Sequence, residues 1–591
     1  MAALNSQATM ETGIEDIAGL VRDLSLAEDE PQDHGQGRLG SKCSHPPSLQ
    51  EAIQVLIRST NNVISQAQAV KSLAGDAKTS GNLSITEICS LREGTKRLAN
   101  IASNLETNID ALNEAMECSV IIRLRSLGSQ STAFVFGRPS IQELFSHFDQ
   151  QIKDIVRRVL NDTSDRDLLW RVAEECYKQA TSPSGILHAD DYFIPREEAC
   201  LEWPYDPDFE SEEYYEHENR LGVDEQYAAA FRARTERRFE TRRKDRQSWI
   251  DFWINVLNNS PSGPTLFYPP ASFSARFFNS NAVPQYLFRT FDDASSGRND
   301  ESVIASKASI TESQESGRTD ILTLEKHKAT KLLHLHLTKP CFGGRCSDDL
   351  MSWTSSLLFA IQYAVWRLRV GERRESEIKI CAVDTKKFPL GQFMRDTSLL
   401  KAYHATAKEL DADDPARKFF DFRLGNEDYY NGEYLSQGAV NHSNRSCVVS
   451  LEHLMQAGLF QLYPEFRDAS GRNLWAKRVR ELRQNWSAEQ GTTDHEIQLA
   501  LAVGRNCFNQ FESIDIAAIL LTFKNRKFSR LTSTDSLNHF SRQWPEWADK
   551  PVEVRRYWSA TKAVNSYNNL LRARFSHLLS HPHKTLREIF D

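Results

Sequence analysis

The chain has 591 residues, of which 40% are hydrophobic and 26% charged, and its formal net charge is -8. This length exceeds that of one domain, and the composition is typical of a globular protein in water. The net negative charge disfavours a protein whose main partner is nucleic acid. No apolar run reaches the roughly eighteen residues that suggest a membrane span, so we expect none.

The N-terminus and the cysteines indicate an intracellular protein. The first residues, MAALNSQATMETGIEDIAGL, lack the basic start and apolar segment of a secretory signal. The ten cysteines are scattered without a C-x-x-C pair, which is typical of reduced thiols rather than of a disulfide framework. We therefore expect a cytoplasmic or nuclear protein that is not secreted.

The first 118 residues divide into a polar start and a segment with heptad patterning. Residues 1–47 are rich in small and acidic residues, so we expect them to be disordered. Over 48–118, apolar residues recur in steps of three and four, which predicts two helices. The recurring positions are Leu49, Ile53, Leu56, Thr60, Val63, Ala67 and Val70, then Leu91, Leu98, Leu105 and Leu112, with Ala102, Ile109 and Met116 offset by four. These seams predict an antiparallel hairpin, a coiled coil between subunits or a plain helical bundle, and hence self-association or a protein partner rather than catalysis.

A second helical region is expected over 139–275. It contains an acidic, aromatic segment, WPYDPDFESEEYYEHENR, followed by a basic one, RARTERRFETRRKDRQSW. The basic segment mixes Glu236, Glu240 and Asp245 with its cations, so it favours a solvated helix face, paired with the acidic segment, over a nucleic-acid site.

From 280 to 467, short apolar runs separated by Asp, Gly and Pro indicate a mixed α/β domain. The runs that predict strands are YLFRTF, KLLHLHLT, EIKICAVDT, YLSQGAV and SCVVS. LLFAIQYAVWRLRV predicts a helix, and the Ser-rich stretch 294–319 predicts a loop insertion. Residues 480–591 return to helical patterning, through HEIQLALAVGRNCFNQF and VNSYNNLLRARFSHLLSH. The expected fold class is α+β, with the mixed domain flanked by helical N- and C-terminal regions.

The stretch MSWTSSLLFAIQYA gathers four hydroxyl residues where a strand is expected to run into a helix. Ser355 or Ser356 is placed to cap that helix. Ser352 and Thr354 alternate along the strand, so they share a face and need other partners if they are buried. Two charged residues lie on other predicted strands, Arg289 within YLFRTF and Glu433 at the start of EYLSQGAV.

An Arg, a Ser-x-Thr pair that runs into a helix, and a Glu, on separate strands and in this order, resemble the ADP-ribosyltransferase fold. The resemblance implies NAD as cofactor, with Arg289, Ser352 and Thr354 as its binding residues. It also implies that Ser352 orients a catalytic Glu433, which would bond the 2′-hydroxyl of the nicotinamide ribose. A fixed carboxylate there would stabilise the oxocarbenium charge that develops as the N-glycosidic bond breaks.

The sequence departs from that pattern at two positions. Trp353 stands between the two hydroxyl residues, where a small residue is usual, and Asn431 stands two residues before Glu433, where an acidic residue or Gln is usual. Structural roles are the alternatives for the charged residues. Arg289 could form a salt bridge with Asp292 or Asp384, and Glu433 could be a surface residue on an edge strand.

A wider resemblance covers about 284–467. The motifs YLFRTF, SWTSSL, ICAVDT and GEYLSQG are similar to those of an uncharacterised domain family common in filamentous fungi. This family carries no activity that could be transferred. The leading functional hypothesis rests on the first resemblance and is an ADP-ribosyltransferase-like, NAD-binding domain. The alternative is a non-catalytic interaction or scaffold module on the same fold.

His334 and His336, which precede Cys341 and Cys346, are candidate ligands of a zinc ion. The alternation of HLHL would place both histidines on one face of a strand, but the C-x4-C spacing is not that of a usual zinc knuckle. We therefore expect no metal.

Overall fold

In the computed structural model of the chain, placement is defined for 48–79, 84–129, 139–162, 167–199, 219–268, 283–310, 318–338, 348–371, 373–426, 429–468, 475–527 and 551–560. The predicted disorder of 1–47 and the predicted helix over 564–581 lie outside these residues. The chain divides into two compact units, Met1–Trp249 and Ile250–Asp591. Within the described ranges, no helix is long and apolar enough to cross a bilayer.

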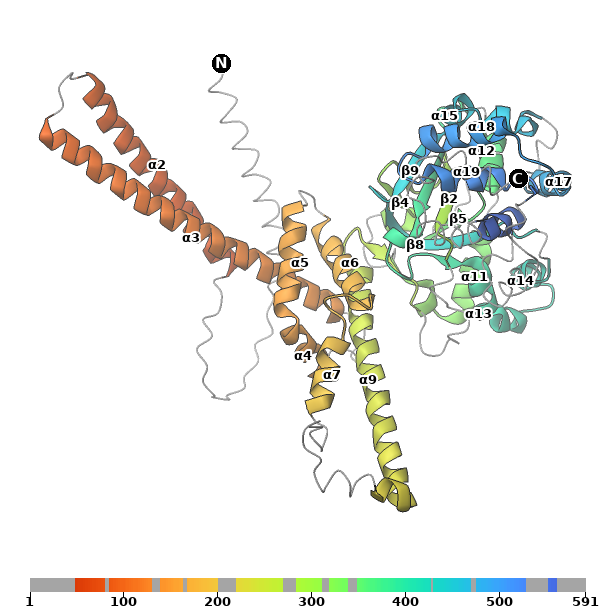
Figure 1. The fold of residues 1–591 in the computed structure, drawn as a ribbon, viewed down its shortest axis with the longest axis horizontal. Helices are drawn as coiled ribbons and strands as arrows, with labels where there is room; N and C mark the ends of the chain where they lie inside the picture. Colours follow the sequence, from red (N-terminus) through yellow and green to blue (C-terminus); the bar gives the residue numbers. More distant parts are fainter. Residues whose placement is uncertain are drawn as a thin grey trace, which may run out of the picture. The chain divides into compact units, whose positions relative to one another are not determined.

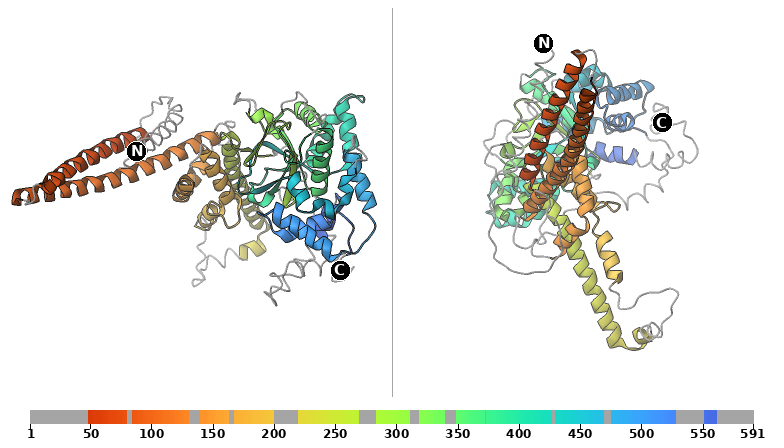
Figure 2. Two further views of the ribbon diagram at one scale, coloured as in Figure 1. Left: turned by 90° about the horizontal axis from the view of Figure 1, so that it is seen from above. Right: turned by 90° about the vertical axis from the view of Figure 1, so that its left-hand side faces the viewer.

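The first unit is helical, as predicted. Its helices are α2 (Leu49–Thr79), α3 (Ile85–Ser129), α4 (Pro139–His147), α5 (Asp149–Asp162), α6 (Leu168–Thr181), α7 (Asp190–Ala199) and the first part of α9 (Glu225–Asn259). α2 and α3 lie side by side as an antiparallel hairpin, and the C-terminal part of α3 packs on α5 and α6 (Figures 1 and 2). An antiparallel hairpin is one of the three arrangements that the heptad pattern predicted.

The contact seam of the hairpin differs from the predicted one. Asn108 donates to the hydroxyl of Ser59 at 2.8 Å, and a Cβ at Gly94 would contact Val70. The residues that accompany the heptad leucines are therefore Gly94, Ile101, Asn108 and Ala115, offset by three. Ala102 and Ile109 are exposed, so the offset of four predicted for α3 was wrong at these two positions; on α2, the predicted seam residue Thr60 is exposed as well. Positions three and four residues away both lie close to a heptad leucine, and here the polar Ser59–Asn108 pair occupies the seam.

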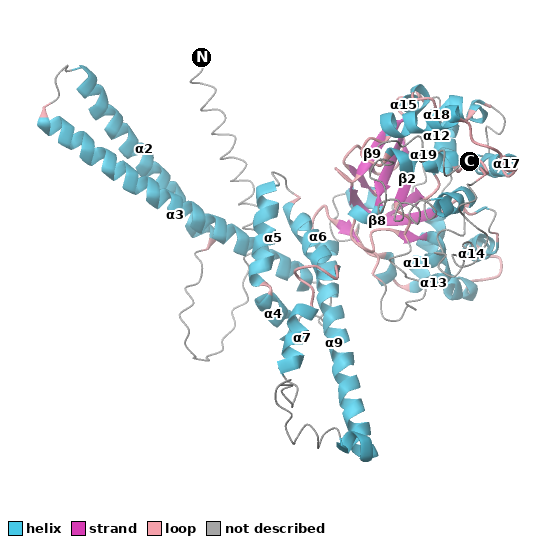
Figure 3. Cartoon of the chain, viewed as in Figure 1, coloured by secondary structure: helices cyan, strands magenta, loops and turns pink. Residues whose placement is uncertain are grey.

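The second unit is built on one curled antiparallel sheet (Figure 3). Its strands are β1 (Pro264–Thr265), β2 (Tyr286–Phe291), β3 (Arg298–Asn299), β4 (Val303–Ala305), β5 (Leu350–Thr354), β6 (Lys379–Asp384), β7 (Met394–Arg395), β8 (Glu433–Asn441) and β9 (Ser446–Ser450). The order is β3-β4-β8-β5-β2-β6-β9, and β1 and β7 also pair with β8. The expected α+β class is confirmed.

Helices cover one face of this sheet, here called the helical face. They are α11 (Lys326–Leu337), α12 (Leu357–Val370), α13 (Asp396–Glu409), α14 (Pro415–Gly425), α15 (Leu451–Gln456), α16 (Leu459–Leu462), α17 (Trp475–Asn485), α18 (Asp494–Cys507) and α19 (Ser513–Leu521). The unit also contains the short helix α10 (Lys307–Ile310) and 3-10 turns such as η4 (Thr385–Lys387). α12, α18 and α19 pack on Phe288 and Ile380, whereas α11, α13 and α14 pack on Leu350 and Leu435. The inner face carries a separate apolar cluster that includes Trp353.

Two predicted elements were wrong. KLLHLHLT is not a strand but helix α11, whose N-terminus is capped by the Glu325 carboxylate. Its buried residues Ala329, Leu333 and His336 are spaced as on one face of a helix. The prediction failed because a run as short as KLLHLHLT fits both the period of a strand and that of a helix. The loop predicted over 294–319 contains β4, which pairs with β8 and buries Ile304 completely. A strand of three residues gives almost no periodic signal.

The hydroxyls at the start of α12 differ in role, which gives a stability prediction. Ser356 accepts from the backbone N–H of Phe359 at 3.0 Å and also bonds the buried Glu553 carboxylate. The buried hydroxyl of Ser355 has no hydrogen-bond partner in the described part of the chain. Ser356→Ala should therefore lower the free energy of unfolding by about 1–3 kcal/mol. The matched control Ser355→Ala should be nearly neutral in urea unfolding, and a larger loss for the control would contradict the assignment.

Candidate functional site

Three of the four residues predicted to form a site lie on the helical face. In the pairing of β5 with β8, Thr354 is opposite Glu433 and Ser352 is opposite Leu435. Opposite residues of an antiparallel pair point to the same face, and so do alternate residues of one strand. Leu435 belongs to the cluster beneath α11 and α13, which identifies that face. The structure therefore brings Ser352, Thr354 and Glu433 together.

Arg289 points to the inner face instead. The next residue along β2, Thr290, donates to the carbonyl of Ala360 in α12, so the side chain of Arg289 faces away from that helix. Arg289 donates to the Asn299 side chain at 3.3 Å and to the backbone carbonyl of Ser352 at 2.7 Å. Burial among these neutral acceptors lowers the pKa of its guanidinium to about 10.

The salt bridges considered for Arg289 are also absent from the described residues. Asp292 forms a buried ion pair with Arg367, whose Nε lies 2.7 Å from the Asp292 carboxylate. Asp384 accepts from the backbone N–H of Lys386 at the start of η4. Arg289 therefore joins β2 to β3 and β5 through neutral hydrogen bonds, and the predicted pairing with Asp292 or Asp384 was wrong.

Thr354 and the two departures from the transferase pattern have structural partners. The Thr354 hydroxyl donates to the carbonyl of Asn431 at 2.7 Å and accepts from the backbone N–H of Ser356 at 3.0 Å. The Asn431 side-chain oxygen accepts from Arg483 at 3.0 Å. Trp353 is buried on the inner face and donates to the Ser436 hydroxyl at 2.8 Å. These bonds fix the end of β5 and the turn before β8.

Ser352 contacts a histidine–aspartate pair that the sequence interpretation missed. His336 on α11 lies with its Nε2 at 3.0 Å from the Ser352 hydroxyl and its Nδ1 at 2.9 Å from the Asp348 carboxylate. Both His336 and Asp348 are buried. A helical interpretation of 326–337 would have placed His336 on the buried face, together with Ala329 and Leu333. The incorrect prediction of a strand for this segment is the reason that His336 was missed.

Glu433 lies beside an arginine that it shares with a second carboxylate. Nη2 of Arg423, on α14, is 2.9 Å from Glu433 and 2.6 Å from Asp396, the first residue of α13. The Asp396 side chain is fully buried, whereas that of Glu433 remains 25% exposed. Glu433 is not on an edge strand, because β7 and β5 flank this end of β8. Its carboxylate can therefore be reached by a ligand while its position stays fixed.

The surroundings of Glu433 favour its protonated form. Its pKa is raised to about 7; burial is the largest cause, and the neighbouring Asp396 carboxylate also raises it. Arg423 and a hydrogen bond from Ser352 act in the opposite direction. Carboxyl groups with pKa values near neutrality are typical of catalytic and binding sites, although structural ion-pair networks produce them too.

The chain Asp348–His336–Ser352–Glu433 can hold one proton in two places. If Ser352 donates to an ionised Glu433, it accepts from Nε2–H of a His336 that is protonated on both nitrogens. If Glu433 is protonated and donates to Ser352, the hydroxyl donates to Nε2, and Nδ1–H of a neutral His336 donates to Asp348. The two arrangements carry the same net charge, so this constellation can pass a proton between Glu433 and the buried His336.

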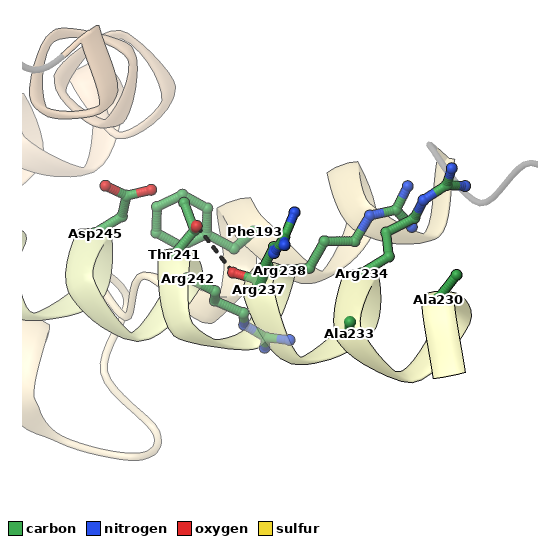
Figure 4. A pocket seen from close by; sticks show the side chains of 9 residues that line it. All are labelled: Phe193, Ala230, Ala233, Arg234, Arg237, Arg238, Thr241, Arg242 and Asp245. Carbon is green, nitrogen blue, oxygen red and sulfur yellow. Dashed lines mark hydrogen bonds between the residues drawn. The ribbon is translucent and has the colours of Figure 1, made fainter. Parts of the chain in front are cut away.

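A basic groove occurs in the first unit, along α7 and α9 (Figure 4). Its polar lining is mostly arginine from one face of α9: Arg234, Arg237, Arg238 and Arg242. Arg242 also pairs with Asp190 at 3.0 Å. The basic segment is thus a helix, as predicted. Of the acidic segment expected to pair with it, residues 203–218 lie outside the described residues.

The zinc hypothesis gains nothing from the structure. His334 and His336 are two residues apart on helix α11, so they do not share a face, contrary to the strand prediction. Cys341 and Cys346 lie outside the described residues. The described ranges contain no cluster of three or more His, Cys, Asp or Glu side chains that could hold a metal.

Residues 282–454 match a domain of unknown function (DUF7587). The match runs from just before β2 into α15 and includes Arg289, Ser352 and Glu433, so the expected uncharacterised domain is confirmed in this part of the chain. No curated protein and no solved structure matches the chain.

The raised pKa of Glu433 gives a pH-dependent prediction. Its ordinary value is 4.5 and its folded value is about 7, so the folded protein holds a proton that the unfolded chain releases. The resulting stabilisation is complete below the unfolded pKa and is lost as the pH rises through the folded pKa. Urea unfolding between pH 4.5 and 7 should therefore show wild type losing stability relative to Glu433→Gln. Buried carboxyls remote from Arg423 are common to both proteins and cancel, so the difference reports Glu433 together with its neighbour Asp396. A relative gain for wild type would show that the attraction of Arg423 outweighs burial.

Proposed function

We propose that the central domain binds a ribose-bearing nucleotide through Ser352 and Glu433. NAD is the member of this class that the resemblance to ADP-ribosyltransferases implies. The observation that carries the proposal is the partly exposed carboxylate of Glu433, fixed by Arg423 at 2.9 Å and hydrogen-bonded by Ser352. A carboxylate and a hydroxyl on adjacent strands offer an acceptor and a donor to the hydroxyls of a ribose.

Glu433 is the catalytic carboxylate in this proposal. NAD would supply the N-glycosidic bond whose cleavage develops positive charge on the ribose. An ionised Glu433 stabilises that charge, and Arg423 keeps it from turning toward solvent. Ser352, itself held by His336, orients the carboxylate by donating to it. His336 also offers a place for the proton that Glu433 must lose to act in this way.

The diphosphate of NAD fits the site less well than the ribose. Arg289, to which the resemblance assigns the diphosphate or the ribose, faces the other side of the sheet. Arg423 is the cation nearest the carboxylate, but Asp396 and Glu433 already neutralise it. Arg289 is therefore not included in the proposed site.

A non-catalytic interaction or scaffold module is the second candidate. It is favoured by the same orientation of Arg289, which leaves the transferase constellation incomplete. In that case the network around Arg423 ties α13 and α14 to β8, and the raised pKa of Glu433 is a by-product of burial.

Isothermal titration calorimetry of the full chain with NAD separates the two candidates. The first predicts heat of binding, and release of nicotinamide in a separate assay. Glu433→Gln should retain binding and lose turnover, because the carboxylate acts on charge that develops in the transition state. Ser352→Ala and His336→Ala should both lower turnover by about 10–100-fold through misorientation of Glu433. Ser355→Ala is the matched hydroxyl control and should leave binding and turnover unchanged.

Arg289→Ala provides a further discrimination. It should leave the affinity for NAD unchanged once the variant is shown to be folded by circular dichroism. Absence of heat and of thermal stabilisation at millimolar NAD would reject the nucleotide proposal in favour of the interaction module.

A further inference from the structure

Helix α3 carries a second series of residues seven apart that does not take part in the hairpin seam. This series is Ile88, Thr95, Ala102, Ile109 and Met116. Ile88 is 50% exposed and Ile109 is 43% exposed. On α2, Ile57 and Ile64 are also seven apart, and they are 48% and 50% exposed. A repeated apolar series at heptad spacing is the pattern by which one helix packs against another.

These residues lie on one side of the hairpin. Ile57 and Ile64 each follow a seam residue of α2, namely Leu56 and Val63, by one position. Ala102 and Ile109 likewise follow Ile101 and Asn108 of the α3 seam.

Both helices are right-handed and run antiparallel, so positions that follow the seam by one residue turn toward the same side of the pair. We call Ile57, Ile64, Ile88, Ala102 and Ile109 the second stripe. The positions that precede the seam, on the other side, are mostly polar and are exposed: Val55, Asn62, Asn100, Asn104 and Thr107.

We propose that the second stripe packs against the same stripe of a second copy of this chain, so that two hairpins form an antiparallel four-helix bundle. The proposal concerns the first unit and does not depend on the nucleotide site. A second copy is the partner whose stripe necessarily has the same spacing and length. Packing the two stripes together would remove four large isoleucines of each chain from water.

The charges along α3 support a copy in the antiparallel orientation. Arg92 and Lys96 lie toward one end of the exposed surface of α3, and Glu106, Asp110 and Glu114 lie toward the other. A two-fold axis that crosses α3 near residue 101 places Arg92 of one chain opposite Asp110 of the other, and Lys96 opposite Glu106. Parallel packing would place like charges together. α2 has few charged residues. If α3 packed against α2 of the second copy, the charged residues of α3 would therefore have few residues of opposite charge facing them.

Sedimentation of the full chain tests the proposal. Wild type should sediment as a dimer, and Ile64→Asp with Ile109→Asp should sediment as a monomer with unchanged helical circular dichroism. Val55→Asp is the matched control, because Val55 is exposed on the opposite side of α2, and it should remain dimeric. A wild-type monomer at all concentrations would overturn the proposal, and so would a dimer that survives the double substitution.

Two further variants test the orientation. Arg92→Glu should raise the dimer dissociation constant about tenfold, and adding Asp110→Arg should restore it, because the cross-chain pair is re-formed with reversed charges. Ala102→Cys lies close to the proposed axis, so under mild oxidation it should give a disulfide-linked dimer that neither wild type nor Val55→Cys gives. A dimer without this cross-link, or a charge reversal that does not restore affinity, would contradict the antiparallel two-fold arrangement.

Discussion

The antiparallel pairing of β5 with β8 is the constraint on which the site depends. It places Thr354 opposite Glu433, and a shift of one residue would turn Glu433 to the inner face, away from Ser352. The turn before β8 fixes this register. Gly432 has a φ of +68°, a backbone conformation that glycine adopts without strain, and its carbonyl accepts from the backbone N–H of Ser355 at 2.8 Å. A Cβ at Gly432 would collide with the Ser355 hydroxyl, so the strand start requires glycine here.

Once the register is set, electrostatics decides what the site can do. Arg423 is shared by a buried carboxylate, Asp396, and a partly exposed one, Glu433, so the three groups carry one net negative charge if all are ionised. Burial makes that excess charge costly and raises the pKa of both carboxyls, and Glu433, as the partly exposed member, is the one that a ligand can reach. The chain through Ser352 to His336 supplies a buried alternative site for the proton. The same contacts that hold α13, α14 and α11 against the sheet thus also tune one carboxylate.

Much of the fold could be predicted from local patterns, whereas the site required tertiary contacts. α2, α3 and α12 have long apolar periods, and β2, β6, β8 and β9 are bounded by turn residues, so each was identified by its own sequence. β4, with three residues, is too short to show a periodic pattern. The apolar residues of α11 are spaced so that they fit both the two-residue period of a strand and the 3.6-residue period of a helix. Which face Arg289 occupies follows from register and curl, neither of which is visible in YLFRTF. Arg423 and Asp396 contact Glu433 only because α14 and α13 pack beside β8. The spacing of these residues in the sequence does not predict that contact.

The central claim is that Glu433 is a partly buried carboxylate that a ligand can reach and whose pKa this network shifts to near neutrality. Its protonation can be followed directly by the pH titration of the carboxyl ¹³C resonance in labelled protein, assigned by its loss in Glu433→Gln. The account predicts a midpoint near 7, together with a response of the His336 ring resonances over the same pH range, because the two groups are joined through Ser352. A midpoint at or below the ordinary 4.5, with His336 unresponsive over that range, would contradict it and leave Glu433 as one half of a structural ion pair.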